Sequence, residues 1–122
     1  MPNPVTHFEI VGRDAGGLQR FYSEAFAWEL EGAGPSYAMV YPRAETGIDG
    51  GIGSPPEGGD ASRVTVYIAV DDVEEALRRV ESLGGTRVLG PVDVPGGPNI
   101  ALFSDPEGHV IGLTRASSIQ GR

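Results

Sequence analysis

Two stretches of the chain have the hydrophobic spacing of amphipathic helices. In residues 71–83, apolar positions recur every three or four residues and form one stripe. Asp72 stands at the N-cap position with Glu75 three residues later, a spacing that satisfies free backbone N–H groups at the start of a helix. The other helix, earlier in the chain, is predicted to begin near Asp14. Its apolar side comprises Leu18, Phe21, Tyr22, Ala25 and Phe26.

Short runs with the alternation of β-strands precede and follow each helix. Residues 5–11 come before the first helix and residues 64–70 before the second. The runs after the helices are 28–31, 36–41, 50–53, 86–89, 99–104 and 110–115. Each half of the chain therefore reads strand, helix, and then two or three strands. A shift of 58 positions carries Asp14 onto Asp72 and strand onto strand, which predicts a structural duplication.

These elements predict an α+β fold made of two βαβββ modules within one domain that covers residues 1–122. Module 1 is expected at about 4–53 and module 2 at about 63–115. The stretch GIDGGIGSPPEGGDAS is rich in glycine and proline, and its later part, about 54–62, is expected to link the modules. The length of 122 residues suits one compact domain.

Strand alternation groups the side chains that can share one face of a sheet. The uniformly apolar face of each strand that precedes a helix is expected to lie under that helix. The opposite face, here called the polar face, carries His7, Glu9, Thr65 and Tyr67. Tyr37 and Tyr41 share the parity of Met39, but alternation alone does not tell which face these side chains occupy.

Glu9 is the most informative residue of the polar face. A carboxylate in mid-strand is costly to bury unless it is hydrogen-bonded or binds a ligand. Glu9 is therefore either a binding group or a side chain on a solvated strand face. His7 lies two residues earlier on the same face, and these two side chains alone cannot complete a metal site. His109 follows a Pro-Glu-Gly turn and is expected at the surface.

Composition narrows the classes of function. The chain has no cysteine, which excludes disulfides, thiolate zinc sites and cysteine nucleophiles. Its net charge of -8 disfavours binding to nucleic acid and to anionic membranes. No apolar run approaches the roughly 20 residues of a membrane helix, and the first residues lack the features of a signal peptide. A cytoplasmic location is therefore expected.

Three stretches of the sequence resemble the vicinal oxygen chelate superfamily, which includes glyoxalase I, bleomycin-resistance proteins and extradiol dioxygenases. They are THFEIVGRD followed by FYSEAFAWEL, then VYIAVDDVEEALRRVESLGG, and LFSDPEGHVIGL. The likeness extends from about Val5 to Arg115. The resemblance implies that the two tandem βαβββ modules form a curved, incomplete barrel around a cavity.

The resemblance also implies metal ligands on the first and last strands of each module. The first of these positions corresponds to His7. The others correspond to Thr65, to Gly112 and to residues 50–53, where no histidine or glutamate occurs. A full metal site is therefore not expected, with His7 as a ligand at most, and no cofactor is expected. A divalent metal held weakly by His7, Glu9 and water is the alternative.

Two functions are compatible with these residues and with the resemblance. The first is a metal-independent small-molecule-binding protein, similar to bleomycin-resistance proteins. Its ligand-binding residues would be His7, Glu9, Thr65, Tyr67, Tyr37, Tyr41 and Phe103. The second is a lyase- or isomerase-type enzyme in which Glu9 acts as a general base beside a carbonyl group. A homodimer is expected in either case, because family members often pair and open sheet edges favour a partner.

Overall fold

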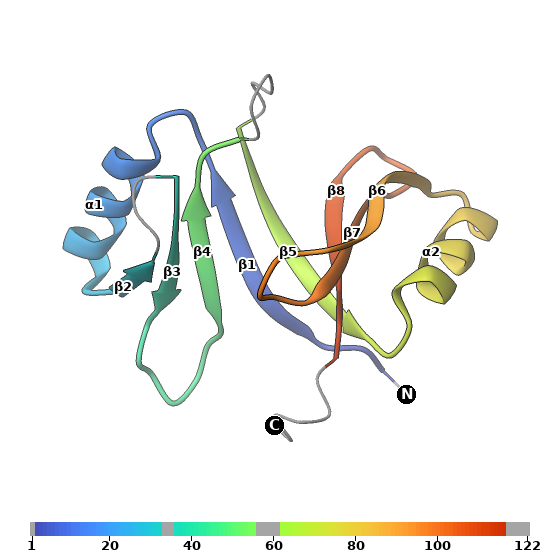
Figure 1. Ribbon diagram of the computed structural model, residues 1–122, viewed down its shortest axis with the longest axis horizontal. Coiled ribbons are helices and arrows are strands. Elements are labelled where there is room, and N and C mark those ends of the chain that lie inside the picture. Colours follow the sequence, from blue (N-terminus) through green and yellow to red (C-terminus); the bar gives the residue numbers. More distant parts are fainter. Residues whose placement is uncertain (1, 33–35, 56–61, 117–122) are drawn as a thin grey trace. The chain divides into compact units, whose positions relative to one another are not determined.

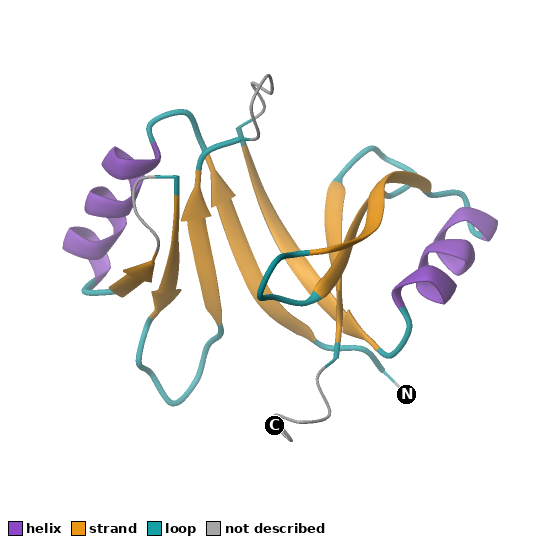
Figure 2. Cartoon of the chain, in the orientation of Figure 1, coloured by secondary structure: helices purple, strands orange, loops and turns teal. Residues whose placement is uncertain are grey.

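The computed structural model describes residues 2–32, 36–55 and 62–116. In chain order its elements are β1 (Val5–Val11), α1 (Ala15–Phe26), β2 (Glu29–Gly32), β3 (Tyr37–Tyr41), β4 (Asp49–Gly53), β5 (Arg63–Val70), α2 (Val73–Ser82), β6 (Thr86–Asp93), β7 (Asn99–Ser104) and β8 (Val110–Arg115) (Figure 1). The described residues thus contain the order βαβββ twice, which confirms the α+β fold (Figure 2).

The chain divides into two compact units. The first unit spans Thr6–Thr65, and its strand order is β2-β3-β4-β1. The second unit contains the described residues up to Val5 and from Val66 onward, with the strand order β5-β8-β7-β6. In both orders the strand that precedes the helix runs parallel to the last strand, and the remaining neighbours are antiparallel. The two orders therefore follow one pairing scheme.

Both helices begin at an aspartate N-cap, and the two caps lie 58 positions apart as the sequence predicts. The Asp14 side chain accepts a hydrogen bond from the backbone N–H of Gly17 at 3.0 Å. Asp72 accepts one from the N–H of Glu75, also at 3.0 Å. Each cap satisfies a backbone donor that has no partner inside the helix. The same local chemistry therefore starts both helices.

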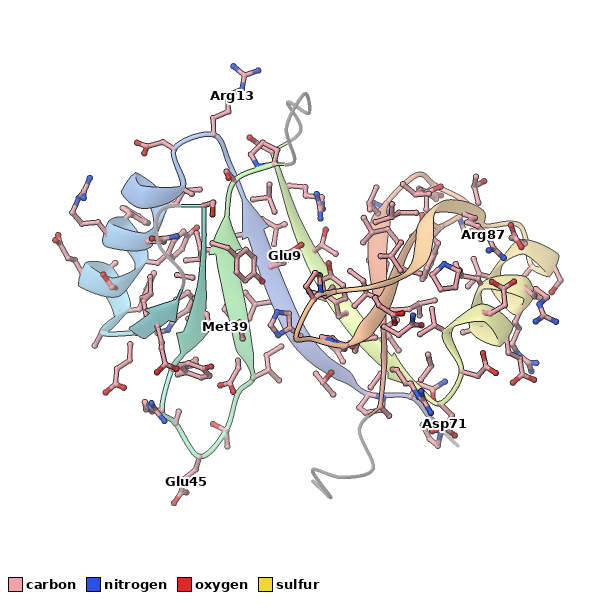
Figure 3. The ribbon with its side chains drawn as sticks, in the orientation of Figure 1. Glu9, Arg13, Met39, Glu45, Asp71 and Arg87 are labelled. Atoms are coloured by element: carbon pink, nitrogen blue, oxygen red, sulfur yellow. The ribbon has the colours of Figure 1, made fainter. Side chains whose placement is uncertain are left out.

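The core of the second unit lies between α2 and its sheet. It consists of Val70, Val73, Leu77, Ala101, Phe103 and Leu113. Leu83, the last residue of the predicted stripe, lies outside this core and is 74% exposed, because the helix ends at Ser82. Arg87 of β6 pairs with Glu74 and Glu81 of α2, which ties the helix to the edge of the sheet (Figure 3).

In the first unit, Val40 and Ile52 are fully buried. The aromatic residues on the α1 side of the sheet form a cluster in which Trp28 stacks on Tyr22, with ring centroids 5.5 Å apart. The predicted apolar side of α1 is wrong in part, because Phe21 and Phe26 are each 59% exposed. These two rings pack against the edges of the cluster and do not enter the core.

Five strands differ from their predicted bounds: β2, β3 and β4 by one residue at one or both ends, and β5 and β6 in ways that change their content. β5 begins at Arg63, one residue earlier than predicted, which brings an arginine into the strand. β6 continues from the predicted end at residue 89 to Asp93. Its pairing with β7 shifts register between Leu89 and Val92, and this irregularity accommodates a glycine and a proline inside the strand.

Candidate functional site

The first unit separates apolar from polar side chains as strand alternation predicts. Phe8 of β1 lies on the α1 side, with its ring 5.5 Å from that of Trp28. Glu9 therefore projects from the opposite face of β1 (Figure 3). The hydroxyl of Tyr37 donates a hydrogen bond to Oε2 of Glu9 at 3.2 Å, which places Tyr37 on the polar face. Met39 and Tyr41 follow by alternation along β3.

Both carboxylate oxygens of Glu9 accept bonds from neighbouring side chains. Tyr37 donates to Oε2, and Nη2 of Arg63 lies 2.9 Å from Oε1. The Glu9 side chain is only 14% exposed. The energetic cost of a largely buried carboxylate in mid-strand is therefore offset by a cation and a hydroxyl donor.

Arg63 is held in turn by Thr65. The Nε–H group of Arg63 donates to Oγ1 of Thr65 at 3.0 Å, and Thr65 is almost completely buried. Thr65, expected as a ligand-binding residue, thus acts as the anchor of a cation. Sequence reasoning missed Arg63 because the predicted strand began one residue later. The two-residue alternation of strands could have identified Arg63, because a residue two positions before Thr65 lies on the same face of the strand.

Two glycines of β4 make room for Tyr37. In the strand register Gly51 lies opposite Glu9, and Gly53 lies opposite Tyr37. A Cβ atom at either glycine would overlap the Tyr37 side chain. The glycine-rich end of the first module, which carries no metal-ligating side chain, is therefore filled by the tyrosine that holds Glu9.

His7 is half-buried on the same face as Glu9, opposite Asp49 of β4 in the strand register. Desolvation by burial lowers the pKa of His7 below 6.5, and the negative charges of Glu9 and Asp49 oppose this shift without cancelling it. The imidazole is consequently neutral at neutral pH. His109 is exposed, as expected, and its Nδ1 lies 3.0 Å from Oδ2 of Asp105.

Three predicted residues remain, namely Tyr67, Phe103 and Tyr41. Tyr67 belongs to the second unit and is 5% exposed, with its ring over Gly112 of β8. Phe103 is part of the core beneath α2, and its role as a ligand contact stays a prediction. Tyr41 lies at the end of β3, where Cζ of the Arg43 guanidinium lies over its ring, 5.1 Å from the ring centroid. In the first unit the site thus consists of His7, Glu9, Tyr37, Arg63 and Thr65.

The described side chains do not fit a divalent metal. Among residues 2–32, 36–55 and 62–116, no group of three or more His, Cys, Asp or Glu side chains could hold a metal ion. Glu9 is committed to Arg63 and Tyr37, and Thr65 accepts a hydrogen bond from Arg63. At Gly112, a side chain of any kind would overlap the ring of Tyr67.

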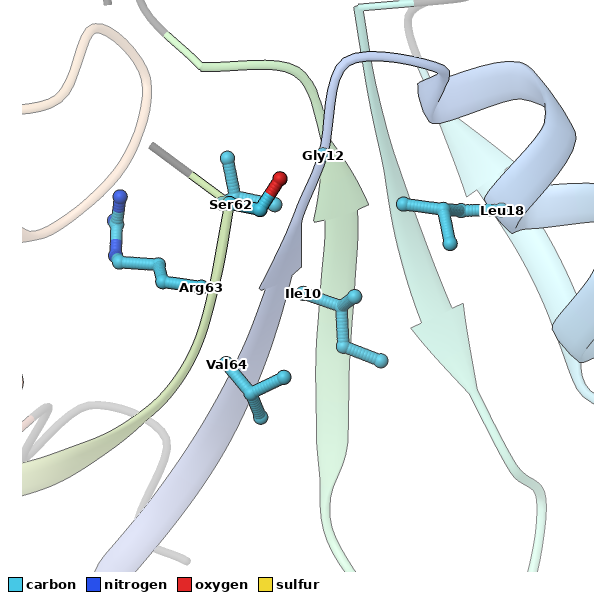
Figure 4. Close-up of a pocket in the computed structure, with 7 residues that line it drawn as sticks. Ile10, Gly12, Leu18, Ser62, Arg63 and Val64 are labelled. Carbon is cyan, nitrogen blue, oxygen red and sulfur yellow. The ribbon is translucent and has the colours of Figure 1, made fainter. Parts of the chain in front are cut away.

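A separate hollow of about 320 Å³ opens near the end of β1. It is lined by Ile10, Val11, Gly12, Leu18, Ser62, Arg63 and Val64. Arg63 directs its guanidinium away from Ile10 and Leu18, so the charged group serves the polar face and not this hollow (Figure 4). Because its surface is almost entirely apolar, the hollow lacks the polar groups that orient a ligand, and the polar face is the stronger candidate site.

The fold and the paired modules agree with comparisons to known proteins. The Glyoxalase-like domain family matches residues 8–114. A methylmalonyl-CoA epimerase structure, solved with methylmalonyl-CoA and NH4+, has a TM-score of 0.72 and 15% identity over 98% of each chain. A glyoxalase/bleomycin resistance protein/dioxygenase superfamily member from Vibrio splendidus has a TM-score of 0.64 and 17% identity, covering 94% of this chain and all of its own.

The match of residues 8–114 covers most of the chain, which therefore belongs to the Glyoxalase-like domain family. Among curated proteins, the anthracycline biosynthesis protein DnrV of Streptomyces peucetius is 39% identical over 57 residues. This match covers 47% of the chain and 21% of DnrV, so the similarity spans about a fifth of that relative. Within the described part of the chain, neither helix has the length and apolar character needed to cross a bilayer.

Proposed function

We propose that this protein binds a small molecule on the polar face of its first unit and does so without a catalytic metal. The observation that carries the proposal is the double engagement of Glu9, whose two oxygens accept bonds from Arg63 and Tyr37. A carboxylate held in this way by two partners is a rigid part of a binding surface.

The side chains of the face indicate the kind of ligand. Tyr37, Met39 and Tyr41 alternate along β3, so an aromatic ring, a thioether and a second aromatic ring share the face with Glu9. Such surfaces favour flat apolar molecules, and the neighbouring polar groups suit ligand oxygens. Similarity to an anthracycline biosynthesis protein supports a planar, oxygen-rich aromatic ligand.

The proposal is tested by ligand binding to the purified protein. Planar hydroxylated aromatic compounds should raise the Tm, because a ligand that binds only the folded state stabilises it. Tyr37→Phe should weaken this effect, since it removes the hydroxyl that holds Glu9. Tyr22→Phe is the matched control, because Tyr22 packs in the aromatic cluster on the α1 side of the sheet. Equal losses in both variants, or no stabilisation by any compound, would reject binding at this face.

The metal-free part of the proposal has its own test. Zinc, nickel, manganese and iron(II) should leave the Tm of the chelator-treated protein unchanged. A rise in Tm that His7→Gln removes would show that a metal binds and that His7 is one of its ligands.

The second candidate is a lyase- or isomerase-type enzyme, and the neutral imidazole of His7 beside Glu9 favours it. In such an enzyme Glu9 would need to leave Arg63 before it could remove a proton from carbon. Glu9→Gln should then abolish turnover of any substrate found while the protein remains folded. Full activity of Glu9→Gln would eliminate Glu9 as the base.

We also propose that the protein forms a homodimer. Exposed apolar side chains such as Val64, at 72% exposure, and Leu83 support burial against a second chain. Sedimentation equilibrium should give twice the mass of the chain, and a monomer at every concentration would remove this proposal.

A further inference from the structure

We infer that Arg63 is the group that recognises the ligand, and that the ligand therefore carries an anionic oxygen, such as a carboxylate, phenolate or enolate. This inference rests on the proposed binding function of the polar face. An acid such as Glu9 would by itself attract a cationic or hydrogen-bond-donating ligand, and the paired Arg63 reverses this preference.

The hydrogen bonds of Arg63 leave part of its guanidinium available. Its Nε–H donates to Thr65 at 3.0 Å, and its Nη2 group donates to Glu9 at 2.9 Å. The Nη1 amino group makes no hydrogen bond with any described residue. A guanidinium has N–H donors and no acceptor, so its remaining donors can only bind an acceptor atom. Two anchored donors also fix the direction of Nη1, which lowers the entropy cost of binding.

Glu9 is the less accessible partner of the ion pair. Its side chain is 14% exposed, whereas that of Arg63 is 24% exposed. The carboxylate already accepts bonds on both oxygens, from Arg63 and Tyr37. An incoming cation would have to displace the guanidinium from Glu9, whereas an incoming anion can bind Nη1 and leave the pair intact. The bonding pattern therefore favours an anionic oxygen over a cationic group.

The other charged groups near Glu9 do not supply an alternative anion receptor. His7 is neutral at neutral pH because burial lowers its pKa, and Asp49 on the neighbouring strand is an acid. Arg43 pairs with Glu29 in a bridge whose partners are both 64% exposed. Arg63 is thus the cation that is anchored beside Glu9 among the described residues of the first unit.

Three probes of the same shape test the charge of the preferred ligand. Salicylate, salicylamide and 2-hydroxybenzylamine share a phenol ring and differ in carrying a carboxylate, a neutral amide or an ammonium group. NMR titration of the full chain should show salicylate binding about tenfold more tightly than either of the others, the size expected for a hydrogen bond between charged groups. Arg63→Met should abolish this preference. Arg78→Met, which removes an exposed arginine of α2 that pairs with Glu74, is the control and should retain it.

The outcomes separate this inference from the binding proposal. If 2-hydroxybenzylamine binds as tightly as salicylate, or if Arg63→Met keeps the salicylate preference, the inference fails while binding at the face stands. If neither these probes nor the aromatic compounds bind, both fail. Arg63→Lys provides a second variant if Arg63→Met unfolds. Because lysine lacks the fixed fork of the guanidinium, a salicylate preference as strong as in the native protein would overturn the role of Nη1.

Discussion

The Glu9–Arg63 pair offers a direct measurement of how much burial strengthens an ion pair in this fold. The first unit contains a second arginine–glutamate pair, Arg43–Glu29, which has nearly the same N–O distance but uses Nε of the arginine in place of Nη2. The N–O distance is 2.9 Å in the first pair and 2.8 Å in the second. The side chains of Arg63 and Glu9 are 24% and 14% exposed, whereas both members of the other pair are 64% exposed. The two pairs therefore differ in burial and in the additional hydrogen bonds that Tyr37 and Thr65 make to the first pair.

Burial should make the Glu9–Arg63 coupling several times larger than the surface coupling. Hydrogen bonds to charged groups in a partly buried site contribute about 1.5–3 kcal/mol, and removal of one partner leaves the other charge poorly compensated. Exposed pairs contribute about 0.2–1 kcal/mol. We therefore expect a coupling free energy of about 2 kcal/mol for Glu9–Arg63 and less than about 1 kcal/mol for Glu29–Arg43.

Two double-mutant cycles measured by urea denaturation provide the test. One cycle combines Glu9→Gln with Arg63→Met, and the other combines Glu29→Gln with Arg43→Met. All four residues lie in the Thr6–Thr65 unit, so both cycles report on the same unfolding reaction. Equal coupling energies in the two cycles, or a native-like stability of Glu9→Gln, would refute the argument from burial.

Three further changes have expected outcomes in the free energy of unfolding. Gly51→Ala should cost about 1–3 kcal/mol in urea denaturation, because the new methyl group overlaps the Tyr37 side chain. Leu77→Ala should cost about 2–5 kcal/mol, since Leu77 is fully buried, whereas Leu83→Ala at the exposed end of α2 should change stability by less than about 0.5 kcal/mol. Burial lowers the pKa of His7 on folding, so the unfolded chain binds more protons between the unfolded and the folded pKa. Stability should therefore fall as the pH drops from 6.5 through the folded pKa, and His7→Gln should reduce that slope.

Each of these outcomes has a control or a contradicting result. Gly16→Ala in α1 has open space for a methyl group and should be neutral or stabilising by about 0.4–1 kcal/mol. A Gly51→Ala variant as stable as Gly16→Ala would show that Tyr37 moves freely. Equal costs for the two leucine substitutions would contradict the core assignment. A pH slope that is unchanged in His7→Gln would remove His7 as its source.

Local sequence pattern was sufficient for most of the fold. The caps at Asp14 and Asp72 lie where the 58-residue shift places them, and the strand before each helix begins within one residue of its prediction. These features depend on short-range rules, namely side-chain capping and two-residue alternation. The exposed rings of Phe21 and Phe26 were not predictable, because periodicity shows which side of a helix is apolar but not how much of that side the sheet can cover.

The candidate site was less predictable because it depends on contacts between distant strands. Alternation correctly grouped His7 with Glu9, but it could not show that Glu9 is bonded to Arg63, which lies 54 positions later. Nor could it place Tyr37, whose face became clear only from its hydrogen bond to Glu9. Residues 50–53 were interpreted as lacking an expected metal ligand, whereas in the structure Gly51 within this stretch provides space for the Tyr37 side chain.

The tyrosine rings that lie over glycines make certain pairs of positions interdependent in evolution. A glutamate at Gly112 cannot be accommodated while Tyr67 covers that position, and a smaller residue at 67 without a new side chain at 112 would leave a void. The same reasoning applies to Gly51 and Tyr37. Evolution of a metal ligand on the last strand would therefore require substitutions at both 67 and 112, and the protein would be less stable after the first of the two. Whether a glutamate is tolerated at position 112 thus depends on the residue at position 67. Libraries of single substitutions should therefore rarely yield a stable protein with a carboxylate at position 112.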